Sequence, residues 1–205
     1  MNKCKDYALL RDVVCEYHPV YSSNEMKNIV LENPNHFNVP RLIEETMAIV
    51  GGYEFVDGAH YDFSDGTECK TASVGINPSD KRYPNGYRAT ISNMSSGAGV
   101  NKTGDTRVVM YNHLTDSVHF LYIPKDHVGR ELHITRNSSS NIGRIEATFN
   151  SKKSEFCKKI KPYFVDSFDV LAQRKPKADP VKKLIFNLDK YSKRFDFTLE
   201  KALQI

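Results

Sequence analysis

Two carboxylates and one ammonium lie close together in the segment Asp62-Phe63-Ser64-Asp65-Gly66-Thr67-Glu68-Cys69-Lys70. A tight turn that ends at Gly66, with that residue left-handed, would place Asp62 opposite Glu68 on a hairpin. Cross-strand neighbours have Cβ atoms roughly 5 Å apart, so both carboxylates could reach one hard cation. Strand residues two apart share a face, which puts Lys70 beside Glu68. This grouping suits metal-dependent cleavage of phosphodiester bonds.

The identity of the first carboxylate depends on the hairpin register. A turn one residue shorter sends Asp62 to the other face, because a one-residue slip reverses every side chain. Asp57 then becomes the alternative metal ligand. In the longer turn, His60 lies across the ladder from Lys70 and is a candidate auxiliary group.

The order of strand, acidic residue, hairpin and Glu-Cys-Lys resembles the PD-(D/E)XK nuclease superfamily, which includes most type II restriction endonucleases. The resemblance covers residues 40 to 75. It implies that Asp62 and Glu68 hold Mg²⁺. It also implies that Lys70 helps to position or activate the attacking water and stabilises the phosphorane.

The chain departs from this motif in two respects. Tyr61 replaces the proline before the first acid, and only five residues separate Asp62 from Glu68. Asp57 fits the customary gap better and stays a candidate for the first ligand. The resemblance also suggests a helix glutamate as a further ligand, for which Glu45 is preferred over Glu44.

Composition indicates one globular domain, because the chain has 205 residues with 40% hydrophobic and 26% charged residues. We expect a single nuclease domain over residues 1–205, with a helical part at 1–52, a sheet with the catalytic hairpin at 53–150 and a basic helical part at 151–205. No long apolar run or signal-peptide pattern is found, so a cytoplasmic location without a membrane partner is expected. Four scattered cysteines without a C-x-x-C pair favour free thiols over zinc.

Periodic patterns predict an α+β fold with a mixed central β-sheet flanked by helices. The family resemblance implies a restriction-endonuclease-like core. Helices are expected over residues 2–16, 23–32, 40–52 and 181–191. Strands are expected over residues 53–56, 59–63, 67–74, 87–94, 107–114, 118–123, 131–136 and 144–149.

Charge is unevenly distributed along the chain. Residues 1–150 hold 15 Lys and Arg against 18 Asp and Glu, a net −3, whereas residues 151–205 hold 14 against 7, a net +7. The basic part could contact phosphates. Loops offer further candidate DNA-binding residues, namely Lys81, Arg82, Tyr83, Asn101 and Lys102.

These patterns together predict a Mg²⁺-dependent endonuclease that hydrolyses phosphodiester bonds of double-stranded DNA. A site-specific type II restriction enzyme is the preferred form, and palindromic sites would call for a homodimer. One alternative is a structure-specific repair or junction nuclease of the same superfamily. Another is a nucleic-acid-binding protein without catalytic activity.

Overall fold

The computed structural model describes residues 3–18, 21, 24, 28, 32, 38–56, 61–78, 81, 83–91, 104–125, 133–136, 145–151 and 153–173. The chain forms two compact units. The helical unit comprises Met1–Phe55, Phe63–Asp65 and Ser167–Ile205, and the sheet unit comprises Val56–Asp62 and Gly66–Asp166. Most of the predicted helix at 23–32, and the whole of the one at 181–191, lie outside the described residues.

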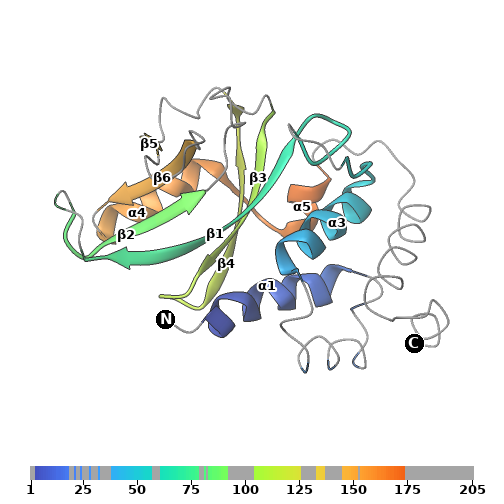
Figure 1. Ribbon diagram of the computed structural model, residues 1–205, viewed down its shortest axis with the longest axis horizontal. Coiled ribbons are helices and arrows are strands. Elements are labelled where there is room, and N and C mark those ends of the chain that lie inside the picture. The colour runs from blue at the N-terminus through green and yellow to red at the C-terminus, as the bar shows by residue number, and fades with distance from the viewer. Residues whose placement is uncertain are drawn as a thin grey trace. The chain divides into compact units, whose positions relative to one another are not determined.

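The helical unit contains α1 (Lys3–Tyr17), α3 (Val39–Gly51) and α5 (Phe168–Ala172) (Figure 1). Helix α3 begins and ends within one residue of the predicted bounds. The side chain of Asn38 accepts a hydrogen bond from the backbone N–H of Arg41 at 3.4 Å, and Pro40 lies in the first turn. Gly52 ends the helix in the left-handed conformation, with φ of 68°.

The interior of the helical unit contains an apolar stripe of α3, formed by Val39, Leu42, Ile43, Met47 and Val50. Four of its positions are buried, while Val50 is only half-buried. The buried four are Val39, Leu42, Ile43 and Met47. Helix α1 packs on both α3 and α5, and the rings of Tyr17 and Phe168 lie 4.8 Å apart. Burial of this stripe is therefore what holds the three helices together.

A histidine is enclosed in the same interior. The His18 side chain is fully buried, and its backbone N–H donates to the carbonyl of Val14 at 2.8 Å. Its ring packs edge-on against Tyr21 at 4.7 Å. Burial lowers the pKa of His18 from its ordinary 6.5 to about 3, and burial together with Glu45 and Cys15 raises the pKa of Tyr21. Both rings are therefore uncharged in the folded protein at neutral pH.

This burial predicts a loss of stability in acid. Between pH 6.5 and about 3 the unfolded chain binds a proton at His18 that the folded chain does not bind. The free energy of unfolding should therefore fall as the pH decreases through this window. Urea unfolding at a series of pH values should show a shallower decrease for His18→Leu than for the wild type. Equal slopes for wild type and His18→Leu would show that the imidazole is not the titrating group.

The described strands form one seven-stranded mixed sheet in the order β5-β6-β2-β1-β3-β4-β7 (Figure 1). Strands β1 and β3 are parallel, and the other neighbours are antiparallel. The predicted α+β class with a mixed sheet is therefore confirmed. The strands are β1 (Glu68–Asn77), β2 (Gly86–Ile91), β3 (Thr106–Asn112), β4 (Ser117–Ile123), β5 (His133–Arg136), β6 (Ile145–Ser151) and β7 (Phe164–Val165).

One face of this sheet is covered by α4 (Lys153–Ile160), which continues into the 3-10 helix η3 (Lys161–Tyr163). The buried side chains of Phe156 and Ile160 on α4 pack in one cluster with Ala72 and Val74 of β1. Alternate residues of a strand share a face, so Glu68 and Lys70 lie on the same face as this cluster. The core face of β1 thus changes from apolar to charged toward the start of the strand.

Among the described residues, no helix is both long enough and apolar enough to cross a membrane. Cys15 and Cys69 are buried free thiols, as expected for these two positions. Cys69 lies on the face of β1 opposite Glu68 and Lys70.

Candidate active site

The chain enters β1 through a tight hairpin whose register differs from both predicted ones. The backbone N–H of Asp62 donates to the carbonyl of Thr67 at 3.1 Å, and the N–H of Val56 donates to the carbonyl of Asp62 at 2.8 Å. Gly66 is left-handed with φ of 80°, as predicted. Asp62 therefore lies opposite Thr67, and the prediction that it pairs across the hairpin with Glu68 is wrong.

Of the predicted strand at 59–63 the structure describes residues 61–63, and Phe63 forms an isolated antiparallel bridge with Phe55. Phe63 is fully buried in the helical unit, with its ring 5.7 Å from that of Tyr53. The backbone N–H of Ser64 donates to the carbonyl of Glu54 at 2.8 Å. The backbone of residues 62–64 thus bonds to residues 54–56 on one side, while the N–H of Asp62 bonds to Thr67 on the other.

The carboxylate of Asp62 nevertheless reaches the start of β1. Its Oδ2 accepts a hydrogen bond from the backbone N–H of Cys69 at 2.7 Å and lies 4.0 Å from Nζ of Lys70. The ammonium of Lys70 also donates to Oε1 of Glu68 and to the carbonyl of Cys69, the latter at 3.1 Å. The structure therefore brings Asp62, Glu68 and Lys70 together, through a bond from side chain to backbone instead of cross-strand pairing.

The three side chains differ in their access to solvent. Glu68 is 1% exposed, whereas Lys70 and Asp62 are 16% and 17% exposed. Burial by itself would lower the pKa of Lys70, but the neighbouring charges of Glu68 and then Asp62 outweigh it, and the pKa is raised. The group thus combines a partly accessible edge with a buried carboxylate held against an ammonium.

The pairing of β1 with β3 fixes the backbone of Glu68. Glu68 is in register with Thr106, and its N–H donates to the carbonyl of Asp105 at 2.9 Å. Immediately before, Gly104 lies so close to the hairpin that a Cβ at this position would overlap the carbonyl oxygen of Gly66. Only glycine permits this approach of two backbones.

Gly104→Ala is accordingly expected to destabilise the fold by about 2 kcal/mol or more, which corresponds to a decrease of roughly 4–8 °C in melting temperature. The matched control is Gly75→Ala, because a Cβ at Gly75 would meet only His113 at an ordinary 3.6 Å. Thermal unfolding of both variants checks the prediction. A Gly104→Ala protein that melts with the control would mean that the backbones separate at little cost.

A buried arginine lies behind the site and was not predicted as a site residue. Arg107 is fully buried and pairs with Cys69 across β1 and β3, so it occupies the face opposite Glu68. It donates to the hydroxyl of Thr67, and its guanidinium carbon lies 5.9 Å from the ring centroid of Tyr122. The available signal was a lone cation within the apolar strand 106–112.

These contacts close a ring around the backbone of Glu68. The hydroxyl of Tyr122 donates to the carboxylate of Asp105 at 2.5 Å, and the carbonyl of Asp105 accepts the N–H of Glu68. Thr67, which precedes Glu68, accepts a hydrogen bond from Arg107, and the guanidinium of Arg107 lies over the ring of Tyr122. This ring of contacts positions the start of β1 from the side opposite the carboxylates.

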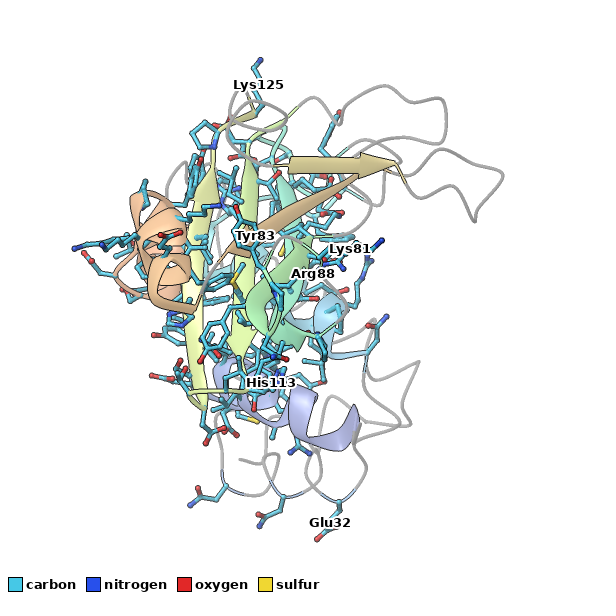
Figure 2. All side chains as sticks on the ribbon, turned by 90° about the vertical axis from the view of Figure 1, so that its left-hand side faces the viewer. Glu32, Lys81, Tyr83, Arg88, His113 and Lys125 are labelled. Atoms are coloured by element: carbon cyan, nitrogen blue, oxygen red, sulfur yellow. The ribbon has the colours of Figure 1, made fainter. Side chains whose placement is uncertain are left out.

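Of the other predicted site residues, the structure describes Glu45, Lys81 and Tyr83. Glu45 is buried in the helical unit, where Nε of Arg41 donates to its carboxylate at 2.8 Å. Lys81 is exposed and Tyr83 half-buried, on the turn between β1 and β2 (Figure 2). This turn is at the far end of β1 from Glu68, roughly 30 Å along the strand. The predicted residues Asp57, His60, Arg82, Asn101 and Lys102 lie outside the described residues.

The metal-binding capacity of the site rests on two carboxylates. In the described part of the chain, no group of three or more His, Cys, Asp or Glu side chains could hold a metal ion. Mg²⁺, however, is commonly bound by only one or two carboxylates, with water and substrate phosphate as its other ligands. Asp62 and Glu68, which both approach the ammonium of Lys70, therefore offer a donor set that fits Mg²⁺.

Comparison of the chain with protein-family models and with curated proteins found no match. The chemistry assigned to the site therefore depends on its own residues and contacts.

Proposed function

We propose that the protein is a Mg²⁺-dependent endonuclease that hydrolyses phosphodiester bonds of double-stranded DNA. One observation carries this proposal, namely the convergence of Asp62, Glu68 and Lys70 at the start of β1. Phosphodiester hydrolysis needs hard ligands for a cation and positive charge near the phosphorane. The group supplies both, and the resemblance to the PD-(D/E)XK motif supports the same reaction.

Each side chain has a distinct role in this proposal. Asp62 and Glu68 would hold Mg²⁺, which when bound polarises the scissile phosphate and acidifies a coordinated water. The N–H of Cys69 orients the carboxylate of Asp62, and the pairing of β1 with β3 orients Glu68. Burial of Glu68 keeps water away from its contacts, which strengthens them.

Lys70 would stabilise the negative charge that develops on the attacked phosphate. Its ammonium is held beside two carboxylates, a position that suits a fixed cation. The contact with the carbonyl of Cys69 restrains its direction further. Lys70 is therefore assigned to charge stabilisation, and a water activated by the cation would be the nucleophile.

A site-specific type II restriction enzyme is the form of this activity that we propose. The mixed sheet, in which β1 pairs antiparallel with β2 and parallel with β3, supports a restriction-endonuclease-like core. Cleavage of a palindromic site would require a two-fold homodimer. Such an enzyme would act in the cytoplasm, where free thiols such as Cys15 and Cys69 persist.

The test is incubation of the purified protein with plasmid and phage DNA in Mg²⁺ and, separately, in EDTA. We expect cutting into discrete fragments in Mg²⁺ and none in EDTA. Cutting confined to branched DNA would show that the protein is a structure-specific nuclease and not a restriction enzyme. Binding without cutting, in Mg²⁺ and in Mn²⁺, would overturn the proposed reaction in favour of a non-catalytic DNA-binding protein.

A further inference from the structure

The turn between β1 and β2 meets α4 through a lysine and an aromatic ring. Nζ of Lys159 lies 5.6 Å from the ring centroid of Tyr83. The side chains of Lys158 and Lys159 are exposed, and so is that of Lys81, which belongs to the same turn as Tyr83 (Figure 2). We call these four residues the lysine–tyrosine surface. It joins two segments that are 76 residues apart between Tyr83 and Lys159 in the sequence.

The packing of α4 explains why its lysines face outward. Phe156 and Ile160, one turn apart, are buried, and the ring of Phe156 lies 5.7 Å from that of Tyr87 on β2. Lys158 and Lys159, which lie between them on the helix, are exposed. Glu155 is exposed one turn before Lys159, so the three lysines of this surface outnumber the one acid described beside them. The surface is positive.

Lys158 and Lys159 of the lysine–tyrosine surface belong to the helix that covers the same side of the sheet as the candidate active site. Helix α4 covers the face of β1 that carries Ala72 and Val74, and Glu68 belongs to that face. The two sites are separated by the length of β1, roughly 30 Å. A duplex rises 3.4 Å per base pair, so this separation equals about nine base pairs.

We infer that the lysine–tyrosine surface binds the phosphodiester backbone of duplex DNA close to one helical turn from the cleaved bond. The identification of duplex DNA as the ligand rests on the proposed function. The positive charge of the lysines is complementary to the negative charge of the DNA phosphates. Lys159 is already oriented by the ring of Tyr83, so less side-chain freedom is lost on binding. A lipid surface would also need clustered apolar side chains, yet Ile76 is the one exposed large hydrophobic residue described on β1 or α4.

The experiment measures binding of a fluorescent 20-base-pair duplex over a KCl series in EDTA, which separates binding from cutting. The full-length wild type is compared with Lys81→Ala/Lys158→Ala/Lys159→Ala. Each phosphate contact contributes about 0.9 to the slope of log K against log salt, so the slope should fall by about 2–3. Affinity at ~100 mM salt should fall at least about tenfold. The control is Arg88→Gln, which removes a half-buried cation from the opposite face and should leave the slope unchanged.

Wild-type affinity and slope in the triple variant would overturn the inference. So would a wild type that ignores the duplex but binds anionic phospholipid vesicles through the same lysines. Cutting of plasmid in Mg²⁺ is measured separately. If the wild type binds duplex with the expected slope but never cuts it, the proposed reaction is wrong and the proposed DNA-binding surface stands. If the triple variant binds and cuts like wild type, the proposed surface is wrong and the proposed reaction stands.

Discussion

Glu68→Gln is expected to lower the rate of Mg²⁺-dependent DNA cleavage by about a thousandfold or more. The substitution removes an anionic metal ligand and the ion pair with Lys70. The glutamine side chain has nearly the same size as glutamate, so no cavity is left at this buried position. A bound cation supplies several kcal/mol of transition-state stabilisation, and each ~1.4 kcal/mol corresponds to tenfold in rate. Single-turnover cutting of labelled DNA measures the loss. Binding of duplex should persist, because the substitution removes negative charge.

The control for this substitution is Asp116→Asn. Asp116 is an exposed acid on the turn between β3 and β4, where its carboxylate accepts a hydrogen bond from Tyr111. It is left-handed, with φ of 52°, and asparagine tolerates this conformation. Asp116→Asn should therefore cut like wild type. A folded Glu68→Gln protein that also cuts at the wild-type rate would remove Glu68 from the reaction.

Arg107→Leu is expected to have the largest effect on stability. The substitution leaves the Thr67 hydroxyl without its charged donor and removes the cation above Tyr122. Hydrogen bonds to charged groups contribute about 1.5–3 kcal/mol, and buried polar atoms left behind add to the cost. We expect a loss of about 3 kcal/mol, which corresponds to roughly 6–12 °C in melting temperature.

Arg107→Lys is the informative companion variant. It keeps the positive charge but lacks the planar fork that can donate to Thr67 while lying over the ring of Tyr122, so it should recover only part of the stability. Thermal unfolding of both proteins gives the comparison. If Arg107→Leu melted within about 2 °C of wild type, the ring around Glu68 would have little energetic weight.

Local rules account for the parts of the fold that the sequence predicts well. The bounds of α3 follow from Asn38, Pro40 and Gly52, each of which acts on its own turn of backbone. The hairpin of β3 and β4 follows from alternating or apolar runs on either side of a polar turn. In these elements, residues near in sequence decide the structure.

The candidate site was predicted in composition but not in geometry. Asp62 joins Glu68 and Lys70 because its carboxylate accepts the N–H of Cys69, a bond that competes with regular strand pairing. Phe63 meanwhile pairs with Phe55 and is buried in the helical unit, which no alternation pattern indicates. Arg107 escaped prediction because its role depends on the parallel pairing of β1 with β3, a contact between strands distant in sequence.

Titration of the protein with Mn²⁺, followed by electron paramagnetic resonance, tests most directly whether Asp62 and Glu68 share a divalent cation. Mn²⁺ prefers the same oxygen ligands as Mg²⁺ and is visible when free. We predict one site in the wild type and in Asp116→Asn, and loss of that site in Asp62→Asn and in Glu68→Gln. Equal Mn²⁺ binding by all four proteins would contradict the metal site and, with it, the proposed hydrolysis.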